Sequence, residues 1–240
     1  MTLHHDHGIV LRTHKFGEAD RIVVILTPRL GKVRAVAKGI RKTTSRIGGR
    51  LEPPTHCSFL LFEGHSELMT ISQAETVDHF RSIRDDLHRL TSSAALCEVA
   101  DLMSPEREQN GRRYQMLLGA LRALAANDSA LLLPAFYLRL LASEGLSPQL
   151  DECVSCGAID ELVAFDTDAG GVLCVACRRG RPISAEGIGL MRRILGGELG
   201  SALNEPESDA TQEVRALATA AMEHHVERRL RAMSVIERGP

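Results

Sequence analysis

Short apolar segments rich in Val and Ile alternate with turn residues between positions 7 and 75 of the chain. Clusters of Gly, Pro, Asp and Ser separate these segments, and the pattern is typical of β-strands joined by turns and loops. The predicted strands are HGIVLRT (7–13), DRIVVILT (20–27), KVRAVAK (32–38), HCSFLLF (56–62) and ELMTISQA (67–74). Five short strands with a long connection after the third predict a small β-barrel of the OB type.

After residue 80 the apolar positions recur with the period of an amphipathic helix. We expect helices over 87–103, 112–126, 129–145, 185–197 and 211–235, with Ser184 as the N-cap of the fourth. The fold class is therefore α+β and multidomain. An N-terminal OB-fold barrel at 1–80 is followed by an all-helical domain at 81–240, into which a cysteine-rich module is inserted at about 149–182.

Four of the six cysteines form two Cys-x-x-Cys pairs, Cys153 with Cys156 and Cys174 with Cys177, in the pattern Cys-x2-Cys-x17-Cys-x2-Cys. This spacing is typical of a structural zinc finger, in which two tight turns supply four thiolates. We predict one Zn²⁺ per chain, with no open position for a substrate. A single redox pair would leave the second pair unexplained. Cys57 and Cys97 lie in apolar patterns and are interpreted as buried, inert thiols.

The net charge of −2 conceals an uneven distribution. Residues 1–50 contain 11 Lys and Arg but only 3 Asp and Glu, and the segment 31–50 contains no acid. Cations at this density repel one another unless a polyanion binds them, which favours a nucleic acid as the partner. A membrane surface or an acidic protein could use the same charges. The predicted DNA contacts are Lys32, Arg34, Lys38, Arg41, Lys42, Arg46 and Arg50.

No pattern of catalytic residues is found, so we expect a protein that is not an enzyme. Gly31-Lys32 lacks the remaining residues of a phosphate-binding P-loop, and the adjacent His224 and His225 would point apart on a helix. Asp166 and Asp168 are interpreted as turn formers. His4, His5 and His7 are interpreted as part of a flexible terminus. No signal peptide or membrane-spanning run is found, which favours the cytoplasm.

The N-terminal string GIVLRTHKFGEADRIVVILTPRLGKVRAVAKGIRKTTSRIGGRLEP resembles the start of the bacterial DNA repair protein RecO family. The shared features are GIVLR, the GEAD turn, T-x-x-x-G-K, AKG-x-RK and SR-x-GG-x-L. The resemblance continues through the helical region, the two cysteine pairs and the closing HHVERRLRAMSV, and so covers nearly the whole chain.

The resemblance implies a recombination mediator with an OB barrel and a helical domain that carries a zinc finger. Such proteins bind single- and double-stranded DNA and anneal complementary strands without ATP. With RecR, and often RecF, they load the RecA recombinase onto DNA coated by single-stranded DNA-binding protein, which places them at the nucleoid. By position, the first candidates for DNA contact are Lys38, Arg41, Lys42 and Arg46.

Two other functions stay open from the residues alone. An OB barrel with a zinc finger also suits an RNA-binding or translation factor, and paired cysteines suit a thiol redox protein. Protein partners are expected to dock on basic islands of the helical domain, which are Arg112, Arg113 and Arg122, and Arg178, Arg179 and Arg181. Phe16, in the HKFGEAD turn, is the one ring of the barrel that we expect to be exposed for base stacking, because Phe59 and Phe62 fit the core.

Overall fold

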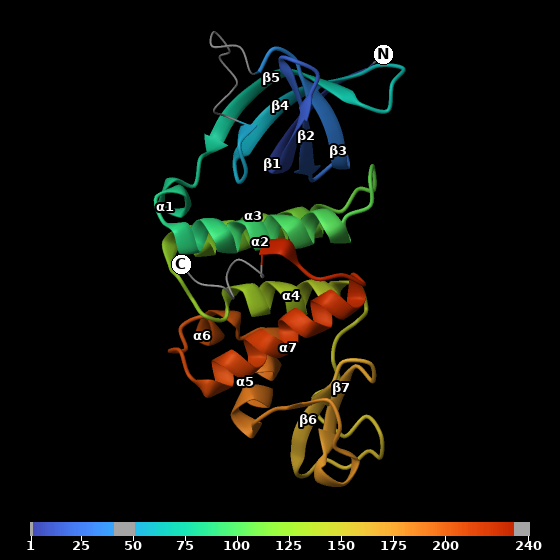
Figure 1. The fold of residues 1–240 in the computed structure, drawn as a ribbon, viewed down its shortest axis with the longest axis vertical. Helices are drawn as coiled ribbons and strands as arrows, with labels where there is room; N and C mark the ends of the chain where they lie inside the picture. The colour runs from blue at the N-terminus through green and yellow to red at the C-terminus, as the bar shows by residue number, and fades with distance from the viewer. Residues whose placement is uncertain (1, 41–50, 233–240) are drawn as a thin grey trace. The chain divides into compact units, whose positions relative to one another are not determined.

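The computed structural model of the chain describes residues 2–40 and 51–232 (Figure 1). Its contacts divide the chain into two compact units. Unit 1 comprises Met1–Ala126 with Leu230–Pro240, and unit 2 comprises Asn127–Arg229. The first helices thus share a unit with the N-terminal strands, and a division into domains at 1–80 and 81–240 stays a prediction.

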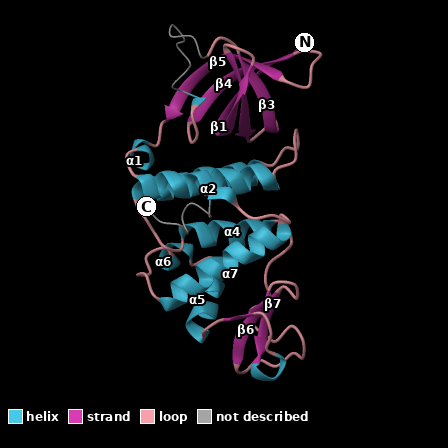
Figure 2. Ribbon diagram, in the orientation of Figure 1, coloured by secondary structure: helices cyan, strands magenta, loops and turns pink. Residues whose placement is uncertain are grey.

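Five strands of unit 1 close into a barrel in the order β1-β2-β3-β5-β4 (Figure 2). They are β1 (Thr2–Phe16), β2 (Asp20–Thr27), β3 (Gly31–Ala37), β4 (His56–Glu63) and β5 (Met69–Asp78). Neighbouring strands are antiparallel except β3 and β5, which pair in parallel. The OB-type barrel that the strand pattern predicted is confirmed.

The apolar runs at 8–11 of β1 and 23–26 of β2 are buried on both sides, which explains why they do not alternate with polar residues. Val10, Val23 and Ile25 point inward and join the barrel core around Phe59. The neighbouring positions on the outer side, such as Ile9, which pairs with Leu26, are also buried, because α2 packs on β1 and α3 on β2. The barrel therefore carries a second apolar layer on its outer side.

Three helices follow the barrel in unit 1: α1 (Arg81–Arg84), α2 (Leu87–Met103) and α3 (Gly111–Ala126). The side chain of Asp86 caps α2 by accepting the backbone N–H of Arg89. At the junction, the Arg84 guanidinium donates to the carbonyl oxygens of Glu52 and Pro54, at 2.7 and 3.0 Å. These bonds hold the start of the helical segment against the connection that precedes β4.

Unit 2 contains four helices and a small sheet with strand order β7-β6-β8. The elements are α4 (Leu132–Ser143), β6 (Leu162–Asp166), β7 (Gly171–Cys174), the 3₁₀ helix η2 (Val175–Cys177), β8 (Arg181–Pro182), α5 (Ala185–Gly196), α6 (Leu199–Ala202) and α7 (Asp209–His225). Helix α7 packs against both α4 and α5. Ser184 caps α5, as predicted, by accepting the N–H of Gly187.

The last helix ends earlier than the sequence predicts. Helix α7 ends at His225, and Glu227 has a left-handed backbone with φ of 52°, which cannot continue a right-handed helix. The predicted helix at 211–235 is therefore wrong between 226 and 230, and its last three residues lie outside the described part of the chain. Among the described residues, no helix is both long enough and apolar enough to cross a bilayer.

Candidate metal centre and nucleic-acid interface

The first cysteine pair lies in a turn closed by backbone hydrogen bonds. The N–H of Cys153 donates to the carbonyl oxygen of Ala158 at 2.7 Å, and the N–H of Gly157 donates back to the carbonyl oxygen of Cys153 at 2.8 Å. Gly157 has φ of 76°, a left-handed conformation that glycine adopts without steric cost. The turn therefore brings the thiols of Cys153 and Cys156 to one side.

The second pair is positioned by the hairpin of β6 and β7. Cys174 is the last residue of β7, and η2 folds Cys177 back beside it. The N–H of Val154 donates to the carbonyl oxygen of Val172 at 3.0 Å, which joins the first turn to the hairpin. The hairpin thus brings the two pairs together, as the sequence predicted.

The four sulfur atoms form one cluster. The Sγ atoms of Cys153, Cys156, Cys174 and Cys177 all lie within 4.8 Å of one another, and those of Cys156 and Cys174 are 3.7 Å apart. A tetrahedron with metal–sulfur bonds of about 2.3 Å has edges of about 3.8 Å, so the spacing fits a metal ion. All four are free thiols, so they form no disulfides. Within the described ranges, no other group of three or more His, Cys, Asp or Glu side chains is arranged for a metal.

The pKa values of two cluster thiols are shifted in opposite directions. Backbone N–H groups, first that of Cys174, lower the pKa of Cys153 to about 6. The N–H of Ala158 lowers the pKa of Cys156, but the three neighbouring thiols outweigh it and raise that pKa to about 12. Four thiolates at this spacing repel one another, and a bound cation would stabilise all of them in the charged form.

The two cysteines outside the cluster are inert, as predicted. Cys57 belongs to the barrel core, and Cys97 is buried on α2. Burial, followed by the charge of Asp101, raises the pKa of Cys97 to about 12. The Cys97 thiol therefore stays protonated at neutral pH, and Cys57 is enclosed by the core.

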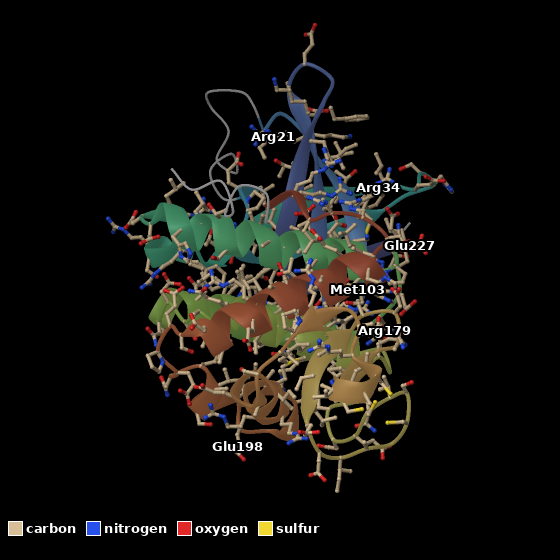
Figure 3. The ribbon with its side chains drawn as sticks, turned by 60° about the horizontal axis from the view of Figure 1, so that its bottom comes forward. Arg21, Arg34, Met103, Arg179, Glu198 and Glu227 are labelled. Carbon is tan, nitrogen blue, oxygen red and sulfur yellow. The ribbon has the colours of Figure 1, made fainter. Side chains whose placement is uncertain are left out.

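Asp166 supports the metal module as a turn former. Its Oδ1 atom accepts the backbone N–H groups of Asp168 and Ala169, at 3.0 and 3.4 Å, and its Oδ2 atom pairs with Arg179, which is labelled in Figure 3. Burial alone would raise the pKa of Asp166, but these bonds lower it, with Arg179 contributing most. The prediction that Asp166 serves the turn is confirmed, and Arg179 is engaged with the module itself.

The basic segment 31–50 is only partly described. Lys32 is 13% exposed, and its Nζ atom donates to the carbonyl oxygen and to Oδ1 of Asp101, at 2.7 and 3.0 Å. Arg34 pairs with Glu106, with 3.4 Å between Nη1 and Oε1 (Figure 3). Lys38 is exposed just after β3. The other four predicted DNA contacts, Arg41, Lys42, Arg46 and Arg50, lie outside the described residues.

Sequence reasoning did not find the partners of Lys32 and Arg34. Lys32 contacts Asp101 in the last turn of α2, and Arg34 contacts Glu106 in the segment between α2 and α3, where the N–H of Arg107 also donates to the carbonyl oxygen of Lys32 at 2.9 Å. Asp101 additionally pairs with Arg12 of β1. The acids lie far from these cations in sequence, and no local pattern indicates such a pairing. Contact of Lys32 and Arg34 with DNA stays a prediction, and the geometry gives both a role in holding the helices to the barrel.

The N-terminal histidines are part of the barrel, so the interpretation as a flexible terminus is wrong. Strand β1 begins at Thr2 and pairs with β4 over residues 2–9. His4 Nε2 lies 2.9 Å from the Glu63 carboxylate, and His5 Nε2 lies 3.1 Å from the Ser58 hydroxyl oxygen. The sequence around these histidines does not indicate a strand, because the strand that pairs with them lies far downstream in the sequence.

Two phenylalanines of β4 lie on opposite sides of the sheet. Phe59 is fully buried in the barrel core, as predicted, whereas Phe62 is half-buried and outside that core. Successive residues of a strand point to alternate faces of the sheet, and these two residues are three positions apart, so their rings lie on opposite faces. The expectation that Phe62 belongs to the core is wrong. Phe16 is 44% exposed at the end of β1, as expected.

Unit 2 contains a pocket of about 510 Å³ among the end of α4, the β6–β7 turn and the end of α7. Leu138, Pro148 and Phe165 contribute apolar lining, and Asp168 and Glu227 contribute carboxylates. His224 also lines it, with Nδ1 3.4 Å from Asp168 Oδ1. The carboxylates make this pocket a poor match for an acidic ligand.

Family models match both halves of the chain. "Recombination protein O N terminal" matches residues 1–80, and "Recombination protein O C terminal" matches residues 84–234. The chain belongs to the RecO family. The DNA repair protein RecO of Frankia casuarinae is 41% identical over 99% of this chain, and that of Thermobifida fusca is equally similar. The protein of the same name from Nocardioides sp. is 40% identical over 98% of this chain, and each of the three relatives is covered in full.

Membership of the RecO family agrees with the architecture of both units. The N-terminal match coincides with the five-stranded barrel, and the C-terminal match contains the four-cysteine cluster. The resemblance that the motifs indicated is therefore confirmed over nearly the whole chain.

Proposed function

We propose that this chain is a DNA repair and recombination mediator. It binds single- and double-stranded DNA, anneals complementary strands without ATP, and helps to load a recombinase onto DNA coated by single-stranded DNA-binding protein. The observation that carries the proposal is the full-length match to DNA repair proteins of the RecO family, on a barrel with a basic segment. DNA binding would place the protein at the nucleoid in the cytoplasm.

Neutralisation of phosphate charge is the proposed basis of annealing. Two complementary strands repel each other through their backbones, and cations bound to phosphates remove that barrier while the base edges stay free to pair. This role makes and breaks no covalent bond, which agrees with the expectation of a protein that is not an enzyme.

The proposed DNA contacts are Lys38, Arg41, Lys42, Arg46 and Arg50. Lys38 is exposed, and the other four continue the same acid-free segment. Lys32 and Arg34 are assigned a weaker part, because their charges are already balanced by Asp101 and Glu106. Moving Lys32 to a phosphate would break a largely buried ion pair and leave Asp101 with Arg12 alone, and moving Arg34 would separate it from Glu106.

Zinc is the proposed metal, with one ion per chain. Four thiolates in tetrahedral spacing are the ligands of structural zinc sites, and they leave no coordination position for a substrate. The ion would supply the charge that holds the four sulfurs together. A thiol redox protein is the alternative, and it would contain the cysteines without stoichiometric metal.

The proposed protein partners are RecR and the single-stranded DNA-binding protein, with RecF as an additional candidate. We assign their docking to the helical region, with Arg112, Arg122, Arg178 and Arg181 as the exposed cations for an acidic segment. Arg113 is only 2% exposed and Arg179 pairs with Asp166, so both are less suited to a partner.

An annealing assay tests the proposed function. Two complementary oligonucleotides, one coated with single-stranded DNA-binding protein, are mixed with the full chain without ATP, and duplex formation is followed by fluorescence. We expect faster annealing than without the protein. Absence of acceleration on bare and on coated strands would contradict the proposal. Tighter binding to folded RNA than to either DNA would favour an RNA-binding or translation factor.

A further inference from the structure

The barrel is covered unevenly on its outer side. On the second half of β1 and on β2, the outward residues Ile9, Val24 and Leu26 are at most 1% exposed. On β3, the outward residue Lys32 pairs with Asp101 near the end of α2, and Arg34 pairs with Glu106 just after that helix. OB barrels commonly bind their ligands on strands 2 and 3. In this chain, part of that face is occupied by the protein's own residues.

The outward residues of the first half of β1 and of β4 form a different surface, which we name the β1–β4 outer patch. Directly paired positions place Leu3 beside Phe62, His5 beside Leu60 and His7 beside Ser58. Side chains of β4 between them, such as Phe59, point into the core. Leu3, His5 and His7 are exposed, whereas the three β4 residues are half-buried. None of the six residues is acidic, and the exposed Glu75 of β5, which pairs with Ser58, borders the patch at one end.

The histidine rings of the patch continue a row of rings that is anchored in the fold. The ring centroids of His5 and His7 are 6.4 Å apart, those of His7 and His56 are 5.7 Å apart, and those of His56 and Tyr114 are 6.1 Å apart. His56 Nε2 is hydrogen-bonded to the Tyr114 hydroxyl at 2.8 Å, and both residues are buried. The inner rings are therefore fixed, and the outer two are presented to solvent.

A cation is held beside these rings. The Arg29 guanidinium donates to the backbone carbonyl of His5 and, at 3.2 Å from Nε, to Oδ1 of Asp6. The Arg29 side chain remains 65% exposed, while that of Asp6 is 3% exposed. One flank of the guanidinium thus binds the barrel, and the rest is available to an anion or to the face of an aromatic ring.

We propose that the β1–β4 outer patch binds unpaired bases of single-stranded DNA by stacking, with Arg29 facing the adjacent backbone. The inference rests on the proposed DNA-binding function and names the part of the ligand that this surface contacts. Exposed rings beside apolar side chains suit the faces of bases, which are accessible only in single strands. The neighbouring cation suits an anion, and the exposed rings favour the bases of a single strand over an acidic protein segment.

Two strands with equal numbers of phosphates separate stacking from charge. One is a thymidine oligonucleotide, and the other is an abasic strand of the same length. We expect the wild-type protein to bind the thymidine strand about 5- to 100-fold more tightly, the range of one stacked base. The double substitution His5→Ala, His7→Ala should remove this difference and leave binding of the abasic strand unchanged.

Two further variants test whether stacking on the two rings causes the preference. The substitution His5→Phe, His7→Phe keeps the aromatic rings and should keep the preference for thymidine. If the imidazoles acted as cations or hydrogen-bond donors instead, this variant would lose the preference. It also keeps the test decisive if the alanine variant fails to fold, because loss of the preference with both rings present would then overturn the proposal. The exposed His79 follows β5, and His79→Ala should bind both strands like the wild type.

The outcomes distinguish this proposal from the proposed function. If the wild type binds neither strand, DNA binding itself fails. Equal binding of both strands by the wild type and by the alanine variant would overturn stacking and leave DNA binding intact. Equal weakening on both strands in the alanine variant would show phosphate contact, which also overturns it. If the alanine variant retains the thymidine preference but no longer binds RecR, the patch is a protein-docking surface and the proposal is wrong.

Discussion

Gly31 lies at the turn into β3, at a point where a side chain does not fit. Its φ is 68°, and a Cβ atom there would lie 2.0 Å from the carbonyl oxygen of Glu108. The next residue, Lys32, uses this close approach to reach Asp101. The sequence alone placed Lys32 among the predicted DNA contacts. At the residue scale, Gly31 allows β3 to pack closely against the segment after α2, and Lys32 binds α2 through Asp101.

Substitution of Gly31→Ala should therefore cost both backbone strain and space. We expect the free energy of unfolding to fall by about 2–5 kcal/mol, measured by urea denaturation. Gly17→Ala is the matched control, because Gly17 has φ of 59° but no neighbouring atom within 4 Å of the added Cβ. That change should cost about 1–2 kcal/mol. Equal losses in the two variants would mean that the contact with Glu108 contributes nothing.

His56 should make the stability depend on pH. Its burial, together with His7 and Arg122, lowers the pKa from 6.5 to about 4, and Asp78 opposes the shift. Between these values the unfolded chain binds a proton that the folded chain does not, so stability falls as the pH drops from 6.5 to 4. Above pH 6.5 the residue contributes no pH dependence.

The expected size of this effect is about 2–3 kcal/mol, from about 1.4 kcal/mol per pKa unit. His56→Gln cannot titrate in this range and should flatten the dependence between pH 4 and 6.5, measured by urea denaturation at several pH values. His79→Gln, at an exposed position, should leave the dependence as in the wild type. If the free energy of unfolding of His56→Gln depends on pH as it does in the wild type, other groups cause the effect.

At the scale of the element, the metal module has almost no core of its own. Its buried cluster consists of Cys153, Ala164, Leu173 and Cys174, two of which are the proposed ligands. A cluster of this size cannot offset the entropy of ordering the whole segment 149–182, so the metal must contribute much of the folding free energy.

Loss of the metal should therefore unfold the module locally. Cys153→Ser, or removal of metal by a chelator, should expose residues 149–182 to protease and to hydrogen exchange, while the barrel of unit 1 keeps its protection. Metal analysis should find about one zinc per wild-type chain. Cys97→Ala removes a thiol outside the cluster and should keep that zinc. Well under one equivalent in the wild type, or an equally protected module in Cys153→Ser, would contradict this account.

The elements that could be predicted from sequence are those with a strong local pattern. The run DRIVVILT coincides with β2, and the period of 3.6 located 87–103, which is α2. Strand β1 was predicted at 7–13 but spans Thr2–Phe16, because its first half is determined by pairing with β4, and a pairing partner is not visible locally. The same limit applies to sites: cysteine spacing indicated the cluster, whereas Asp101 and the β1–β4 outer patch required tertiary contacts.

At the scale of the whole molecule, the uneven charge of the chain is partly balanced within unit 1. Arg12, Lys32 and Arg34 from the basic first 50 positions pair with Asp101 and Glu106 from the acidic remainder. Lys38 and the four cations at 41–50 continue the acid-free segment beyond β3. Fewer of the cations in the first 50 positions are therefore available to a polyanion than their number in the sequence suggests.

This smaller set predicts how DNA binding depends on salt. If Lys38, Arg41, Lys42, Arg46 and Arg50 each neutralise one phosphate, and Arg29 neutralises a sixth on single strands, log K should fall with log salt at a slope of about −4 on single strands and about −4.5 on duplex. The quadruple substitution Lys38→Ala, Arg41→Ala, Lys42→Ala, Arg46→Ala should reduce the slope to about −1 on either ligand and abolish annealing.

Two comparisons test this assignment. Lys32→Ala with Arg34→Ala should lower the free energy of unfolding but change the slope by less than one unit, because these cations already pair with carboxylates. The His5→Ala, His7→Ala variant should weaken single-strand binding at every salt concentration without changing the slope, because stacking releases no counterions. Salt titrations of all four proteins on the same oligonucleotides measure both effects. If the Lys32 and Arg34 variant reduced the slope by about 1.4–1.8 units, the full contribution of two phosphate contacts, those two cations would exchange their acids for phosphates when DNA binds.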